Sequence, residues 1–534
     1  MTSPVPPSAG RQIARAAGTV MLAFLLTQLI GLLRVVVVYR AFGASAGMDS
    51  FNAANRVAEL LFNLVAGGAL GSAFIPTFTG LLARKDQDTA WKLASAVANL
   101  LFLVLTLLAV LSMIFAPQIV RHGLYVLSPG ESPGQEALTA ALLRWLLPTV
   151  VIFGLSGLVM GILNAHQRFW LPAIAPAMYS LGQILGVLLL PSAWGIYRLA
   201  AGALAGALFH LLVQLPDLLR LRGRYWLMLG LRMAEVREVA RLMGPRVLGV
   251  AVVQLNFIVN TIIALSLPEG SVSAVTLAFT WMLMPQVAIA QSVAVAAMPT
   301  FSAQAALGRL DELRTALAAT LRGVILLALP AALGLILLRT PLIRLLYENA
   351  TFTPRMTQMV SWALLWYALG LPGHSLLEVI VRAFYALRDT RTPVSVGVVA
   401  MSLNVGFSFA FSAGFSRLGW MPHGGLALAN SLATLLEMSA LLVLLRRRLG
   451  GLGGRTVLMA LGQAGVGLAL LGAVLWAWLL LEGVLPDWLI VPGGAALGAL
   501  AYAAGLALLR VPEWSALLQA GRRLLARGRS AGIS

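Results

Sequence analysis

Apolar stretches of about 20 residues recur along nearly the whole chain, and a helix of that length crosses the hydrocarbon layer of a membrane once. A spanning helix also pairs every backbone donor and acceptor within itself, as the absence of water in lipid requires. The residues are 60% hydrophobic and 11% charged, against roughly 25% charged in a typical soluble domain. These features predict an all-α, polytopic membrane protein.

The apolar stretches predict fourteen transmembrane helices. They lie near residues 17–41, 54–83, 93–116, 138–164, 172–191, 197–219, 242–266, 272–300, 318–338, 358–385, 393–413, 422–445, 456–481 and 488–510. The first run has no obvious A-x-A cleavage site, so we expect it to stay in the membrane as the first helix. An even number of spans places both termini on the same side.

The basic residues predict the orientation. Of the 38 lysines and arginines, 26 fall in the terminal segments, the even-numbered gaps or the span ends beside them, 7 in the odd-numbered gaps or the span ends beside them, and 5 deeper within spans. By the positive-inside rule, both termini are cytoplasmic. The formal net charge of +19 could suggest a nucleic-acid partner. The arginines, however, lie at membrane edges rather than on one basic domain, so we expect no nucleic acid to bind.

Several chemistries have no support in the sequence. The chain has no cysteine, which excludes disulfides, thiolate metal sites and thiol nucleophiles. No set of acid, base, nucleophile or metal ligands converges, so we do not expect an enzyme. No G-x-x-x-x-G-K-[ST] motif is present, so movement of a substrate would use an ion gradient or the membrane potential. We expect no cofactor, and a coupling ion would be unidentified.

An internal repeat divides the chain. Ile75-Pro76-Thr77-Phe78 matches Met298-Pro299-Thr300-Phe301, Gln28-Leu29 matches Gln254-Leu255, and 164–172 matches 385–393, at offsets between 221 and 226. Six spans separate the copies, which predicts two lobes of the same topology related by an axis along the membrane normal. The predicted parts are a cytoplasmic N-terminal segment (1–16), an N-lobe (17–219), a basic cytoplasmic linker (220–241), a C-lobe (242–445), two additional spans (446–510) and a basic cytoplasmic tail (511–534).

Polar residues inside the spans indicate a wet interior. A charge at membrane depth costs at least about 2.5 kcal/mol, so it usually faces a cavity or a partner. The residues concerned are Gln28 and Arg34 in the first span, the helical stripe Asn52, Arg56, Glu59 and Asn63, and Glu378, Arg382 and Glu437 in the second lobe. We predict that Arg34, Gln28, Asn52, Arg56 and Arg382 bind an anionic substrate, with Asp49, Glu59 and Glu378 as charge partners. Alternatively, Arg56 with Glu59 and Glu378 with Arg382 are intrahelical ion pairs.

A set of short motifs occurs in order along the predicted spans: Phe42-Gly43 through Asp49-Ser50-Phe51, Gly68-Ala69, Ala73-Phe74-Ile75-Pro76, Gly161-Ile162-Leu163-Asn164, Arg168-Phe169, Pro172, Met243-Gly244-Pro245, Leu248-Gly249-Val250, Gly270-Ser271-Val272-Ser273, Phe384-Tyr385-Ala386, Asp389-Thr390 and Thr392-Pro393. In these motifs the chain resembles the MurJ/MviN lipid II flippases of the multidrug/oligosaccharidyl-lipid/polysaccharide exporter superfamily. The resemblance implies two six-helix lobes around a central cavity and two C-terminal helices that form a groove on the lipid side. It also implies alternating-access export of the undecaprenyl-linked peptidoglycan precursor across the bacterial inner membrane, a step in cell wall biogenesis. The partners would be a lipid-linked anionic substrate and membrane lipids.

Part of the family's arginine set is missing. In the first span, Thr27-Gln28 occupies the position of the family's Ser-Arg, and Phe62 occupies that of the arginine in the second span. In the eighth span, Phe279-Thr280 occupies the position of an Asp-Arg. Val35 and Gly67 lie where the family has acidic residues. Arg34 is kept. Either Arg34, Arg56 and Arg382 bind the pyrophosphate, or the chain is an exporter of another polyprenyl-linked saccharide or a small amphiphile. A scaffold without transport activity is the third alternative.

Overall fold

The computed structural model describes residues 9–65, 73–452, 454–509 and 511, and its regular elements are helices. In the first half they are α1 (Ala9–Phe42), α2 (Ala46–Val65), α3 (Ile75–Ala83), α4 (Gln87–Ile114), α5 (Ala116–Ile119), η2 (Val120–Leu124), α6 (Pro133–Ala165), α7 (Trp170–Leu189), η3 (Ser192–Trp194), α8 (Tyr197–Leu212), α9 (Leu215–Arg220) and α10 (Ala234–Leu265). The rest are α11 (Ser271–Gln286), η4 (Val287–Gln291), α12 (Ser292–Ala306), α13 (Leu310–Tyr347), α14 (Pro354–Ala386), α15 (Arg391–Arg417), α16 (His423–Leu449), α17 (Gly454–Leu479) and α18 (Asp487–Leu508). The all-α prediction is confirmed.

Eleven helices of the described residues are long and apolar enough to cross a membrane. The other three predicted spans coincide with α1, with the α2 and α3 region, and with α10. The total of fourteen stays a prediction. The predicted linker 220–241 contains the start of α10, so the segment between the helices α9 and α10 is 221–233.

The chain forms two compact units, one made of residues 1–273 with 349–352 and the other of 274–348 with 353–534. In the first unit, α7 packs along α8 and against α1, and α6 contacts α2, α4 and α8. Glycines allow the closest of these approaches. A Cβ atom on Gly182 would lie 2.2 Å from the Cα atom of Gly206, and one on Gly186 would lie 2.5 Å from that of Gly202. Small residues thus let the backbones of α7 and α8 touch, as is common between membrane helices.

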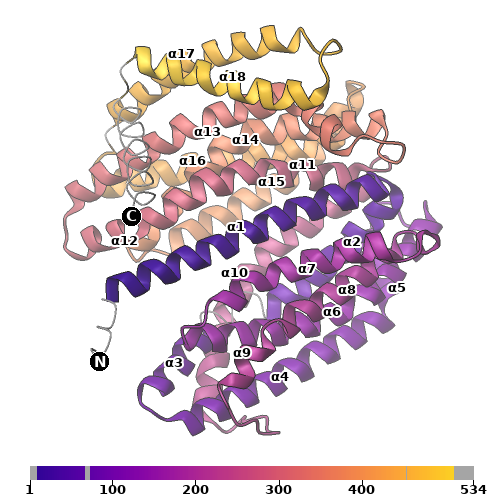
Figure 1. Cartoon of the computed structure of the whole chain (residues 1–534), viewed down its shortest axis with the longest axis vertical. Coiled ribbons are helices and arrows are strands. Elements are labelled where there is room, and N and C mark those ends of the chain that lie inside the picture. Colours follow the sequence, from indigo (N-terminus) through magenta and orange to yellow (C-terminus); the bar gives the residue numbers. More distant parts are fainter. Residues whose placement is uncertain (1–8, 66–72, 453, 510, 512–534) are drawn as a thin grey trace, which may run out of the picture. The chain divides into compact units, whose positions relative to one another are not determined.

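In the second unit, α14 packs against α13 and α16, and α15 packs against α16. The last two helices, α17 and α18, lie side by side against α13 (Figure 1). Arg344 of α13 holds their connection, because its Nε and Nη2 atoms lie 2.5 and 2.6 Å from the carboxylate of Asp487 and its Nη2 lies 2.8 Å from Glu482. A bidentate pair of this kind is among the stronger charge-assisted contacts.

Two pairs of turns support the internal repeat at the level of the backbone. Lys85 and Gly308 have φ angles of 62° and 70°, and Gln167 and Arg388 have φ angles of 61° and 58°. The next amide closes each turn in the same way: Asp86 N donates to Leu81 O, Arg309 N to Gln304 O, Arg168 N to Leu163 O, and Asp389 N to Phe384 O, all within 3.1 Å. These are Schellman-type helix ends. The matched sequences therefore fold into matched turns.

Each half also has an ion pair at the second of these turns, with the charges exchanged. In the first half, Arg168 Nη1 lies 3.2 Å from Asp217 Oδ1 of α9. In the second half, the turn residue is the acid Asp389, which pairs with Arg448 of α16. Each pair joins the loop before the fifth span of a lobe to the end of the sixth.

Acid should weaken the second of these ion pairs. Asp389 accepts hydrogen bonds from the amide and the hydroxyl of Thr392, and these bonds, followed by Arg448, hold the pKa of Asp389 below its usual value. A carboxylate with a lowered pKa stabilises the fold above about pH 4 and loses that contribution below it. We therefore expect Asp389→Asn to lower the apparent Tm in detergent at neutral pH and to have a smaller effect in acid. Asp311→Asn, at an exposed site, is the control, and an equal effect of Asp389→Asn at both pH values would contradict the prediction.

Candidate functional site

Arg34 lies on α1, two turns before its end, and is half-buried. Its Nη1 atom donates to Oε1 of Gln183 on α7 at 3.0 Å. Its Nε atom is buried without a hydrogen-bond partner, and within the described part of the chain no carboxylate pairs with the guanidinium. The charge is held in place by a neutral amide, so it remains available to an anion.

Asn52 and Gln28 have different surroundings. Asn52 Nδ2 lies 3.3 Å from Ser273 Oγ and 3.5 Å from Tyr39 Oη, so its amide is part of a network within the protein. Gln28 is exposed on α1. Beside it, Thr27 Oγ1 donates to the carbonyl of Ala173 at 3.1 Å. The predicted contacts of both residues with a substrate stay predictions.

Arg56 forms the intrahelical ion pair that its spacing indicated. Its Nη1 atom lies 2.8 Å from Glu59 Oε2, and Asn55 Nδ2 donates to the other oxygen of Glu59 at 2.8 Å. The guanidinium also lies over the ring of Phe257, 4.9 Å from its centroid. The charge of Arg56 is therefore compensated within the protein, in contrast to that of Arg34.

Arg382 of the second unit is paired in the same manner. It forms an ion pair with Glu378 one turn earlier on α14, and its Nη1 also contacts the carbonyl oxygen of Glu378 at 3.3 Å. Both side chains are partly exposed. The structure thus confirms the pairing of Glu378 with Arg382, and the role of Arg382 in substrate binding stays a prediction.

Asp49, near the start of α2, ties that helix to the beginning of α11. One carboxylate oxygen accepts from the amide and the hydroxyl of Ser273, at 2.7 and 2.6 Å, and the other from the amide of Gly270 at 2.7 Å. Asp49 precedes the predicted second span and is 3% exposed. Burial raises its pKa to about 6, because the loss of water outweighs the hydrogen bonds to Ser273 and Gly270. Its partners are donors of the chain itself and not an arginine.

Uncharged side chains occupy the positions where the resemblance implies the arginine of the second span and the Asp-Arg of the eighth. Phe62, at the arginine position of the second span, packs against Phe153 of α6, with ring centroids 5.8 Å apart. Phe279, at the Asp position, packs against Tyr367 of α14 at 5.2 Å. Thr280, at the arginine position, donates its hydroxyl to the carbonyl of Thr276 at 2.8 Å. Tilted ring pairs of this kind contribute apolar surface, and none of the three side chains is charged.

Gln183 is the site residue that the sequence analysis missed. It is a polar residue of 2% exposure within a largely apolar span, and the tendency of such residues to form interhelical hydrogen bonds was the signal available in the sequence. The Gly67, Gly68 and Ala69 positions fall outside the described residues. In the described ranges no group of three or more His, Asp or Glu residues could hold a metal ion.

Comparison with solved structures defines the class. The chain has the fold of the MOP superfamily of transporters, since it superposes on an inward-facing MATE-family transporter with a TM-score of 0.68 at 15% identity over 80% of this chain and 94% of that one. It also superposes on a lipid II flippase MurJ in an inward closed conformation, with a TM-score of 0.75 at 24% identity over 92% of this chain and 98% of that one.

Sequence comparison then gives the family. A family model described as lipid II flippase MurJ matches residues 38–491, and the chain belongs to this family. The lipid II flippase MurJ of Burkholderia cenocepacia is 31% identical over 81% of this chain and 84% of its own length. A probable lipid II flippase MurJ of Vibrio cholerae is 29% identical over 91% and 94%. The chain is accordingly a multi-pass inner-membrane protein.

Proposed function

We propose that this protein is a lipid II flippase, which moves the undecaprenyl-linked peptidoglycan precursor from the inner to the outer leaflet. Membership of the MurJ family is the observation that carries the proposal. The transporter would alternate between inward-open and outward-open states, driven by an ion gradient or the membrane potential. We found no ATP-binding motif that would supply another source of energy.

Arg34 is the residue that we propose for the pyrophosphate of this substrate. A guanidinium presents a fork of donors that matches phosphate oxygens, and the interaction strengthens where water is scarce. The side-chain carbonyl of Gln183 accepts a hydrogen bond from Nη1 of Arg34. The Nε atom of Arg34 is buried without a partner, and among the described residues no carboxylate pairs with the guanidinium. The proposal includes further substrate contacts from Gln28, Asn52, Arg56 and Arg382. To contact the substrate, Arg56 and Arg382 would have to leave their ion pairs with Glu59 and Glu378, or bind the substrate and the glutamate at the same time.

The uncharged residues at the missing arginine positions favour a second candidate. Phe62, at one of these positions, packs against another ring, and the hydroxyl of Thr280, at another, is bonded to the carbonyl of Thr276. Fewer cations suit a less anionic cargo. The alternative is an exporter of another polyprenyl-linked saccharide or a small amphiphile, built on the same scaffold.

Complementation separates the two candidates. The chain is expressed in a bacterium whose own lipid II flippase can be switched off, and growth, cell shape and lipid II accessible at the outer surface are measured. The proposed function predicts growth and surface-exposed lipid II. Stable, membrane-inserted protein without either result would favour the alternative cargo.

The proposed topology places both termini in the cytoplasm. It follows from the distribution of Lys and Arg, of which 26 lie on the side of the termini and 7 on the other. Reporter fusions are expected to show the loop 446–455 on the cytoplasmic side and the loop 482–487 on the periplasmic side. Fusions with the reverse result would overturn the topology.

A further inference from the structure

The linker segment 221–233 contains no helix or strand, and its middle part, Tyr225 to Met228, lies against α4. The amide of Trp226 donates to Ser95 Oγ at 3.1 Å, and Asn99 Nδ2 donates to the carbonyls of Trp226 and Met228 at 3.0 and 2.8 Å. Side chains of α4 thereby satisfy backbone groups that would otherwise need water. These bonds fix the register of the segment on the helix.

The outward face of the segment is apolar. The exposed fractions of Tyr225, Leu227, Leu229 and Leu231 are 65, 90, 40 and 62%, and the hydroxyl of Tyr225 donates to Asn99 Oδ1 of α4. The residues between them are partly buried. Three exposed leucines so close together are a patch that proteins rarely leave in water.

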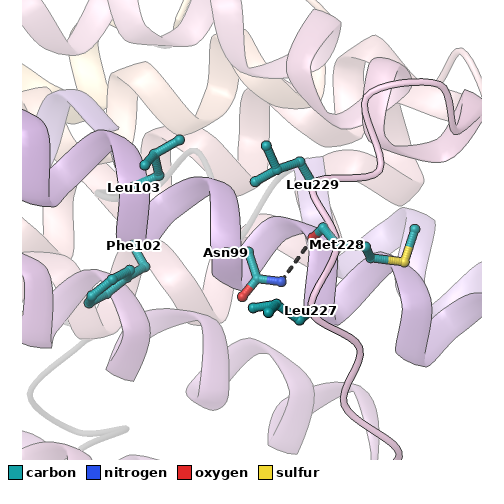
Figure 2. A pocket seen from close by; sticks show the side chains of 6 residues that line it. All are labelled: Asn99, Phe102, Leu103, Leu227, Met228 and Leu229. Carbon is teal, nitrogen blue, oxygen red and sulfur yellow. Dashed lines mark hydrogen bonds between the residues drawn. The ribbon is translucent and has the colours of Figure 1, made fainter.

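A groove of about 340 Å³ lies between the segment and α4. Its lining consists of Asn99, Phe102, Leu103, Leu227, Met228 and Leu229 (Figure 2). Phe102 and Leu103 are 53% and 54% exposed, as expected of helix positions that face lipid. The polar group of this lining, the Asn99 amide, is already bonded to the linker backbone, so the groove offers its occupant an apolar wall.

Arginines flank the groove residues in the sequence. Arg222, Arg224 and Arg232 are exposed, and Arg220 is exposed and paired with Asp217. The guanidinium of Arg224 lies 5.7 Å from the centroid of the ring of Trp226, the residue before Leu227 of the groove. An apolar groove flanked by arginines matches a molecule with a hydrocarbon chain and an anionic head.

We propose that the groove between α4 and the linker segment binds an anionic phospholipid of the adjacent leaflet. The acyl chain lies against Phe102, Leu103 and Leu227, and Arg222 and Arg224 contact the phosphate headgroup. Each arginine near a membrane surface adds about 1 kcal/mol of attraction for anionic lipid. The bound lipid covers the exposed leucines and anchors the linker segment at the interface. The site is separate from Arg34, and its occupation does not require the transport substrate.

Site-specific labelling tests the proposal without interference, because the chain has no cysteine. An environment-sensitive fluorophore is attached to Leu227→Cys, and to Asp311→Cys at an exposed position in the first turn of α13 as the control. Both proteins are reconstituted into nanodiscs of phosphatidylcholine, with or without an equal amount of phosphatidylglycerol, in which one lipid has brominated acyl chains. Size-exclusion elution equal to that of the parent protein verifies the fold.

We expect brominated phosphatidylglycerol to quench the label at position 227 more strongly than brominated phosphatidylcholine, and to leave the label at 311 unaffected. Changing Arg222 and Arg224 to Gln in the Leu227→Cys protein should raise the phosphatidylglycerol content needed for half-maximal quenching by about fivefold for each arginine. Equal quenching by both lipids, or no dependence on the arginines, would overturn the proposal. So would a label at 227 that is shielded in detergent without lipid, since a protein partner or a second copy would then cover the face.

Discussion

Replacing Arg34 by alanine is expected to abolish export and to leave the amount of inserted protein unchanged. Hydrogen bonds to a charged group contribute about 1.5–3 kcal/mol each, so the loss of one or two of them from a bound pyrophosphate should lower transport roughly 100-fold. Arg34→Lys should restore only part of the activity, because an ammonium lacks the planar fork. Surface-exposed lipid II and the protein level by immunoblot are measured together.

The variant Gln183→Glu separates a substrate-binding role of Arg34 from a structural one. The change keeps Arg34 and the size of its partner, but it places a carboxylate 3 Å from the guanidinium in place of the amide. If Arg34 serves the substrate, this internal anion competes and export should fall almost as far as in Arg34→Ala. If Arg34 is merely structural, a stronger partner should be tolerated or raise the apparent Tm. Normal export by Gln183→Glu would therefore argue against the proposed role.

Replacing Asp49 by alanine is expected to cause a large loss of stability. It removes an acceptor shared by two backbone amides and a hydroxyl, and each buried donor left unpaired costs about 1–3 kcal/mol. We expect a total of about 4 kcal/mol, since the amides of Gly270 and Ser273 both donate to this carboxylate. The apparent Tm in detergent at pH 8, where the carboxyl is ionised, measures the effect.

Two further variants serve as references for the loss of stability in Asp49→Ala. Ser273→Ala keeps both amide bonds to the carboxylate and should lose much less. Asp311→Ala removes an acid that is 86% exposed and should be nearly neutral. An Asp49→Ala protein that unfolds at the temperature of the Asp311→Ala protein would show that the three hydrogen bonds contribute little.

Local contacts were the most predictable part of the site. The i, i+3 and i, i+4 spacings of Arg56 with Glu59 and of Glu378 with Arg382 indicated ion pairs, and both are present. The repeat likewise anticipated which turns would match, because matched residues impose similar backbone conformations. By contrast, Gln183 is 149 residues from Arg34, and Ser273 is 224 residues from Asp49. Such pairs depend on how the helices pack, which no periodicity in one sequence encodes.

The helices were also more predictable from the sequence than the bonding partners of the polar side chains within them. Hydropathy alone indicated the helices, since lipid leaves the backbone few alternatives. The stripe on α2 predicts substrate contacts for Asn52 and Arg56, with an Arg56–Glu59 ion pair as the alternative; in the structure Asn52 bonds to Ser273 and Arg56 pairs with Glu59. A stripe shows which side of a helix avoids lipid. It does not distinguish a side chain that is hydrogen-bonded within the protein from one that is available to bind a ligand.

The exchanged charges of the two loop pairs have a consequence for assembly in the membrane. The halves of this chain are similar enough that a helix hairpin from one half could dock on the other, or on a neighbouring copy. A crossed arrangement would bring Arg168 to Arg448 and Asp389 to Asp217, so both contacts would join like charges. Repulsion between wrong partners gives specificity that attraction alone does not. The exchanged polarity of the two pairs therefore disfavours the crossed arrangement.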